Sequence, residues 1–118
     1  MIKSKQIQNS IDRLNYYDAR AQKLESSYFG DETTLTFEGI DKDNILKFVG
    51  CYKVLFDHVK NYDKFRPVKE MIIPQIPYFL QKIEVEDVEI DGKQFLKCNI
   101  NMFPLYIELI CENISVSN

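Results

Sequence analysis

The sequence lacks most of the residues from which familiar active sites and metal sites are built. It has 118 residues with one histidine, three cysteines and no tryptophan. Cys51, Cys98 and Cys111 form no C-x-x-C pair, so the ligand spacing of a zinc site is missing. The four glycines stand alone, which excludes a glycine-rich phosphate loop, and no G-x-S-x-G segment is present. We therefore expect no catalytic residues, no metal and no cofactor.

Long hydrophobic runs are also absent. No stretch approaches the roughly 18 apolar residues of a membrane-spanning helix. The first six residues carry positive charge, but no apolar segment follows them as it would in a secretion signal. An odd number of cysteines within apolar runs is typical of buried, reduced thiols. These features predict a cytoplasmic protein without a membrane span.

One nucleophile–base pair could be drawn from the residues that remain. A thiolate needs a nearby base, and Cys51 and His58 fall within one predicted strand. Their separation of seven residues puts them on opposite faces of a regular strand, so they cannot meet without a bulge. We expect His58 to be partly exposed at the end of that strand. The sequence therefore predicts no enzyme, with an unrecognised active site as the alternative.

Apolar and aromatic residues are what the chain has in quantity. They include 8 Phe and 7 Tyr, and apolar types make up 45% of the sequence, which is enough for one sizeable core. Only four Gly and four Pro are present, which argues against a disordered or fibrous chain. We expect a single domain over residues 1–118.

Most of the chain has the two-residue period of β-strands. The exception is residues 4–16, where Ile7, Ile11 and Leu14 have helical spacing. Apolar residues occur on both faces of residues 45–59, which predicts a central strand with Tyr52 in the core. Alternation predicts further strands at residues 19–29, 33–38, 83–90, 95–102 and 105–111, with a shifted phase at 114–116.

Turn signals complete this pattern. Asp91-Gly92 predicts a type I′ hairpin, and a change of phase at Glu86-Asp87 predicts a β-bulge. Residues 60–78 contain three prolines and predict a long loop with one short helical turn. The fold class expected is mainly β, an antiparallel β-sandwich or strongly curved sheet of six to seven strands with one N-terminal helix.

The charge balance argues against a dedicated nucleic-acid binder. Fifteen basic and 18 acidic residues give a net charge of −3, whereas such binders are clearly basic. Residues 53–69 nevertheless concentrate lysine and arginine near aromatic residues, which is the raw material of a phosphate-binding and base-stacking surface. A small housekeeping β domain that binds nucleic acid through this basic stretch is therefore kept as an alternative.

The order of features resembles a known group of proteins. A short helix leads into Tyr17-Asp18-Ala19 and Leu35-Thr36-Phe37, and Phe79-Leu80-Gln81-Lys82-Ile83 follows the proline-containing loop. Met102-Phe103-Pro104-Leu105 then precedes the last alternating run. This pattern resembles small bacterial proteins, some of them regarded as immunity proteins of polymorphic-toxin systems. The resemblance implies a cytoplasmic domain that binds and blocks a cognate toxin domain, and it assigns no site residue.

Acidic residues near the predicted hairpin suggest where such a partner would bind. With the bulge in place, Glu84, Glu86 and Glu89 would all point away from the buried residues of the strand. Toxin domains that act on nucleic acids often have basic sites, which an acidic ridge could cover. We predict partner binding at Glu84, Glu86 and Glu89. The alternative is that these acids keep a β-edge from pairing with other chains.

Overall fold

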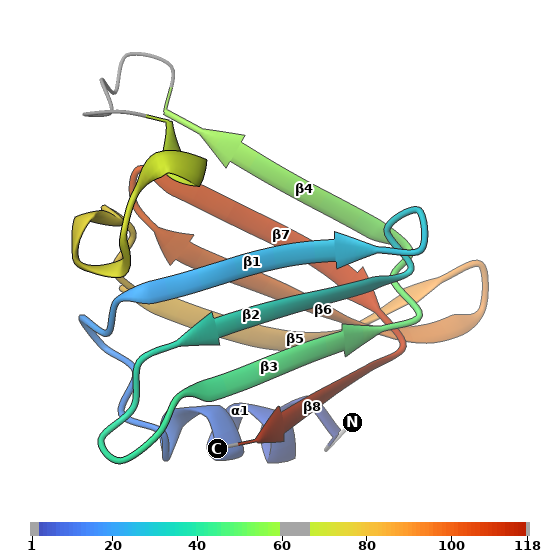
Figure 1. Cartoon of the computed structure of the whole chain (residues 1–118). Coiled ribbons are helices and arrows are strands. Elements are labelled where there is room, and N and C mark those ends of the chain that lie inside the picture. Colours follow the sequence, from blue (N-terminus) through green and yellow to red (C-terminus); the bar gives the residue numbers. More distant parts are fainter. Residues whose placement is uncertain (1–2, 60–66, 118) are drawn as a thin grey trace.

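Two antiparallel sheets of four strands each form the described part of the chain (Figure 1). The computed structural model describes residues 3–59 and 67–117. The first sheet has the order β1-β2-β3-β8, with bounds Ala21–Ser27, Glu32–Phe37, Asn44–Val49 and Asn113–Ser117. The second sheet has the order β4-β7-β6-β5, with bounds Lys53–His58, Leu105–Cys111, Lys93–Met102 and Lys82–Ile90. The predicted mainly β, antiparallel fold is confirmed.

The chain passes twice between the sheets at one corner. β3 leads into β4 through Gly50, and β7 leads into β8 through Glu112. Gly50 has a left-handed backbone with φ of 63°, and the Glu112 amide donates hydrogen bonds to the carbonyls of Val49 and Gly50 at 3.1 Å. The left-handed residue turns the chain out of the first sheet, so the predicted single strand over 45–59 is two strands. β3 is central in its sheet, but β4 is an edge strand, so the predicted central strand is wrong for its second half.

The core lies between the inner faces of the two sheets. Alternate residues of β2 and β3 are fully buried, among them Phe37 and Phe48. They belong to the same buried cluster as Ile83, Ile100 and Leu109 from the second sheet. Burying each such side chain stabilises the fold by about 1.5–3 kcal/mol, which makes this cluster the main source of stability.

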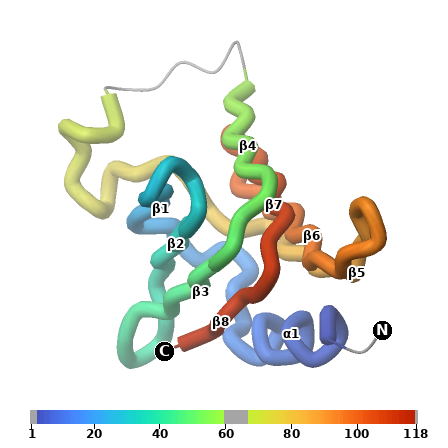
Figure 2. The backbone as a smooth tube through the Cα atoms, turned by 90° about the vertical axis from the view of Figure 1, so that its right-hand side faces the viewer, coloured from blue at the N-terminus to red at the C-terminus, as the bar shows by residue number. Residues whose placement is uncertain are grey.

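Helix α1, Lys3–Asp12, lies beside β5 and β8 (Figure 2). Its residue Ile11 is fully buried in the core. The helix ends four residues before the predicted position, because Leu14 and Asn15 donate to carbonyls only three residues back and Asn15 then takes a left-handed φ of 51°. None of the described helices is long and apolar enough to cross a membrane.

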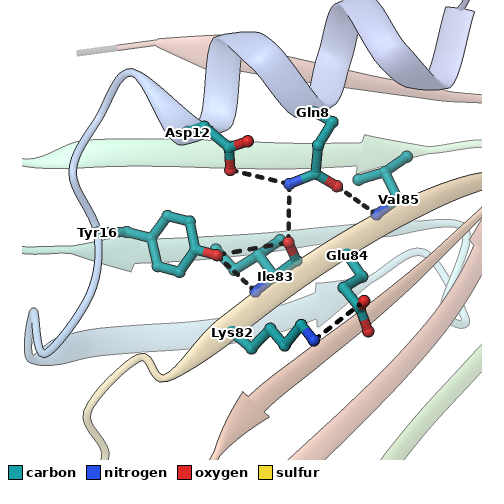
Figure 3. Close-up of polar contacts among 7 residues, drawn as sticks. All are labelled: Gln8, Asp12, Tyr16, Lys82, Ile83, Glu84 and Val85. Atoms are coloured by element: carbon teal, nitrogen blue, oxygen red, sulfur yellow. Dashed lines mark hydrogen bonds and ion pairs between the residues drawn. The ribbon is translucent and has the colours of Figure 1, made fainter.

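Side chains after and within α1 bind the outer edge of β5 (Figure 3). The Gln8 amide group donates to the Ile83 carbonyl at 2.8 Å and accepts from the Val85 amide at 2.7 Å. The Tyr16 hydroxyl accepts a hydrogen bond from the Ile83 amide at 3.0 Å. These contacts satisfy backbone groups that an edge strand would otherwise expose.

The hairpin of β5 and β6 has the predicted turn but not the predicted bulge. Asp91 and Gly92 both have positive φ, 49° and 79°, which confirms the type I′ turn. The strands pair without a register shift from Lys82 opposite Asn101 to Ile90 opposite Lys93, so the bulge at residues 86–87 is wrong. The apolar residues change from one face of β5 to the other without a bulge. Val88 and Ile90 face outward, and Val88 lies opposite the buried Phe95.

The described part of the segment between β4 and β5, over residues 67–81, is irregular, as predicted. Its described part contains two short 3-10 helices, η1 at Val68–Glu70 and η2 at Ile73–Gln75. The backbone at residues 78–80 then pairs with residues 18–21, including a bridge between Arg20 and Phe79. Residues 60–66 lie outside the described part of the chain.

Tyr52 lies outside the core in which it was predicted, whereas the three cysteines are free thiols. Tyr52 is 61% exposed rather than buried, and its ring packs against Phe95 with 5.4 Å between centroids. The strand pattern predicted that the Tyr52 side chain points into the core, but the turn at Gly50 interrupts that pattern. Cys98 and Cys111 are buried free thiols as expected, and Cys51 is a half-buried free thiol.

Candidate functional site

The outer face of the second sheet carries an organised polar surface. Antiparallel pairing places its side chains in rows that run across all four strands. One row joins Leu55, Glu108, Asn99 and Glu84. We call this surface the outer face; besides that row it comprises Lys53, Asp57, Lys82, Glu86, Lys97, Asn101, Tyr106 and Ile110.

The middle of the outer face is hollow. A cavity of about 320 Å³ lies over the strands, lined by residues from β4, β5, β6 and β7. Leu55 and Tyr106 contribute apolar surface to it and are 43% and 41% exposed. Asn99 and Glu84 contribute hydrogen-bonding groups. An exposed aromatic and an aliphatic residue beside hydrogen-bonding groups form a surface suited to binding another molecule.

Two ion pairs join basic and acidic side chains on the outer face. Lys53 Nζ lies 2.8 Å from Glu108 Oε2, and Lys82 Nζ lies 3.3 Å from Glu84 Oε2 (Figure 3 shows the second pair). The hydrogen bond from Lys53 lowers the pKa of Glu108, with Lys97 adding to the effect. Glu108 is therefore an anion at neutral pH. Both pairs are solvent-exposed, so they orient side chains more than they stabilise the fold.

The structure brings together two of the three predicted acids. Glu84 and Glu86 are exposed on the outer face, and Glu84 lines the cavity. Glu89 is exposed on the opposite face of β5, where its carboxylate accepts a hydrogen bond from Gln94 at 3.2 Å. The predicted common face for all three depended on the bulge, and without the bulge the strand's alternation separates Glu89 from the others.

Sequence reasoning missed the contributions of β4, β6 and β7. Alternation at Tyr106 and Glu108 signals that these side chains face away from the core. It does not signal that they lie beside Asn99 and Leu55, because that depends on strand order. The outer face is therefore a property of the topology rather than of any one segment.

The other sequence candidates do not assemble into a site. His58 is exposed at the end of β4, as predicted, with its ring 6.3 Å from that of Tyr78. Burial raises the pKa of the Cys51 thiol and raises that of Cys111 to about 12, so neither is an activated nucleophile. Over residues 3–59 and 67–117, no group of three or more His, Cys, Asp or Glu residues could hold a metal ion.

The predicted basic stretch at residues 53–69 is only partly described. Lys53 is paired with Glu108, and Lys69 is exposed on η1. Lys60, Lys64 and Arg66, with their aromatic neighbours Tyr62 and Phe65, lie outside the described residues. No described basic surface therefore supports nucleic-acid binding.

The fold defines a class of mainly β proteins with two antiparallel sheets and an N-terminal helix. A similar arrangement occurs in the crystal structure of an uncharacterized protein from Neisseria gonorrhoeae, with a TM-score of 0.60 and 17% identity. The match covers 87% of this chain and 93% of the other, and at this identity it shows the fold alone. The family model described as immunity protein PIM7 matches residues 3–118. The chain belongs to this family of immunity proteins, and the resemblance inferred from its sequence is confirmed. A search of curated proteins found no match.

Proposed function

We propose that this protein binds and blocks a cognate toxin domain, and that it does so without catalysis. The family match over residues 3–118 is the observation that supports an immunity role. An immunity protein needs a surface that covers its toxin rather than a site that transforms a substrate. The thiols with raised pKa values and the single exposed histidine are consistent with such a binding protein.

The outer face is the surface that we propose for the toxin. Its cavity presents the exposed Tyr106 and Leu55 with charged and amide groups around them. Aromatic residues are enriched at the centre of protein interfaces, and polar groups at their rim. Tyrosine is frequent among the residues that dominate binding energy, because its ring buries a large area while its hydroxyl forms hydrogen bonds.

The acidic ridge Glu84, Glu86 and Glu89 extends this proposal to the charge of the partner. Glu84 lines the cavity, Glu86 lies on the same face of β5, and Glu89 lies on the other face of that strand. A basic toxin surface that approaches β5 would meet all three carboxylates at long range, although only two share the outer face. Such charges accelerate association more than they raise affinity. The partner we propose is therefore a basic toxin domain.

The proposal is tested by an arginine placed in the middle of the outer face. Asn99→Arg in β6 places a long, positively charged side chain in the cavity and blocks it. We expect the fold to be retained, because the neighbouring side chains Glu84 and Glu108 are carboxylates. Thr36→Arg is the matched control, because Thr36 is a half-buried residue on the outer side of the first sheet. Each variant is co-expressed with the candidate toxin domain found by sequencing the genes that flank this one, and growth and complex formation are measured.

We expect Asn99→Arg to lose protection and complex formation, and Thr36→Arg to keep both. Equal protection by the two folded variants would exclude the outer face as the binding surface. Failure of the unmodified protein to bind or protect against that toxin domain would overturn the proposed function itself.

A further inference from the structure

The two edges of the second sheet differ. The β5 edge is bound by Gln8 and Tyr16, whereas β4 has β7 on one side and no described strand on the other (Figure 1). The amide of Val59 donates to the carbonyl of Pro104, which extends the β4–β7 ladder by one residue. The alternation of an antiparallel ladder then directs the backbone groups of Val54, Phe56 and His58 away from β7.

The side chains of β4 are also exposed. Leu55 and Phe56 are 43% and 37% exposed, in a strand where Val54 alone is half-buried. The strand has Lys53 at its start and Asp57 near its end. An apolar edge whose outward backbone groups pair with no described strand is a surface on which another extended strand can add hydrogen bonds.

We propose that β4 pairs in antiparallel orientation with β4 of a second copy of this chain, about a two-fold axis at Leu55. Around such an axis each residue lies opposite its mirror position in the strand. Lys53 lies opposite Asp57 of the second copy, and Val54 lies opposite Phe56. The strand is therefore complementary to itself in charge and in apolar contact.

The backbone fits the same register. Val54 and Phe56 are the residues whose amides and carbonyls point outward, so each can exchange a pair of hydrogen bonds with its opposite residue in the second copy. Moving the axis to Phe56 would place Leu55 opposite Asp57 and would lose both ion pairs. Charge and apolar matching thus select the register centred on Leu55.

The pairing would extend the outer face across two molecules. Lys53, Leu55 and Asp57 all point to the outer face, so the two second sheets would form one eight-stranded sheet. Asp57 lines the cavity of one copy and would meet Lys53 of the other. The pairing does not depend on the proposed function, because it involves this chain alone.

The test is a charge exchange measured by sedimentation over a range of protein concentrations. We expect a concentration-dependent dimer, weakened about tenfold or more by Asp57→Lys, since two like-charged pairs then face each other. Asp57→Lys combined with Lys53→Asp should restore it. Lys82→Asp on the far strand β5 is the control and should leave the dimer unchanged.

A second variant tests the backbone contacts. Val54→Pro removes an outward amide without removing a bond to β7, so the folded monomer tolerates it and the dimer loses two hydrogen bonds. Thermal melts establish that each variant is folded. A protein that stays monomeric at its highest soluble concentration overturns the proposal. So does a dimer insensitive to both the charge exchange and Val54→Pro, or β4 variants that weaken only binding to a toxin strand.

Discussion

The side-chain amide of Gln8 occupies the position of a neighbouring strand beside Val85. Its carbonyl oxygen accepts the Val85 amide at 2.7 Å while its nitrogen donates to the carbonyl two residues earlier. One helical side chain thus reproduces the pair of hydrogen bonds that a β-ladder would form. The helix protects the sheet edge through this residue as well as through its apolar packing.

Replacing Gln8 by alanine should destabilise the protein and expose the β5 edge. Loss of two partly buried hydrogen bonds costs about 1–3 kcal/mol of unfolding free energy. Aggregation on prolonged incubation should increase, because free edges pair with other chains. Gln6→Ala is the matched control, since Gln6 is exposed on the same helix. Equal urea midpoints for the two variants would contradict the role of Gln8.

Replacing Gly50 by alanine should destabilise the corner between the sheets. A left-handed backbone costs a residue with a Cβ about 1–2 kcal/mol, and a Cβ at Gly50 would lie 2.7 Å from Glu112 Oε1. Gly92→Ala is the control, because Gly92 also has positive φ but no heavy atom within 4 Å of such a Cβ. The first variant should have the lower melting temperature. Equal melting temperatures would show that the Glu112 side chain moves aside freely.

The tip of the β1–β2 hairpin should be easy to stabilise. Tyr28 and Phe29 both have left-handed φ, 55° and 58°, and both are exposed. The double variant Tyr28→Asn with Phe29→Gly would introduce the preferred type I′ sequence and should raise the unfolding free energy by about 1 kcal/mol. Urea denaturation measures the effect. A fall in stability would show that these aromatic side chains pack in a way that compensates for the strain.

The Lys53–Glu108 pair should make a small contribution to stability that depends on pH. The pKa of Glu108 is lowered in the folded protein, so this contribution is present above the usual glutamate value of about 4.3. It is lost as the pH falls through the lowered pKa, because the protonated carboxyl no longer accepts charge-assisted bonds. Lys53→Met should therefore reduce the melting temperature slightly at pH 7, and this difference should shrink as the pH falls through the lowered pKa of Glu108. A difference that stays constant over the whole acid range would show that lost packing, not charge, is the cause.

The acidic ridge should control the rate at which the toxin binds. Changing Glu84, Glu86 and Glu89 together to glutamine should slow association and remove much of its salt dependence. Stopped-flow mixing with the toxin domain at several ionic strengths measures both. If the acids serve instead to prevent edge pairing, binding kinetics would stay the same and aggregation would rise.

A matched triple variant controls for the change in net charge. Glu25→Gln, Asp41→Asn and Glu70→Gln remove the same charge from exposed positions outside the outer face. Association that slows equally in both triple variants would show that overall charge, rather than the acidic ridge, attracts the toxin.

Local alternation was sufficient to predict most strands. Residues 33–38 and Asp91-Gly92 follow rules that involve only near neighbours in the chain, and both predictions are confirmed. Residues 45–59 also alternate, but the left-handed backbone at Gly50 divides them between two sheets. A glycine within a strand pattern signals irregularity without specifying its direction.

The candidate site was harder to predict because it depends on which strands are neighbours. Glu84 could be identified as exposed, but its position across β6 from Glu108 follows from strand order. That the Val88 side chain points outward could likewise be predicted only from its neighbour Phe95, which lies on a different strand. Pairing between distant segments is encoded by packing of the whole core and not by the local period.

The binding of Gln8 and Tyr16 along β5 has a consequence for assembly. A sheet that could accept strands at both ends would permit unlimited growth into fibres. Here α1 covers the β5 edge, so a strand added at β4 would occupy the other edge of the second sheet, beside which no strand is described. An assembly built through the proposed pairing of this sheet would therefore be finite and would end at a pair of molecules.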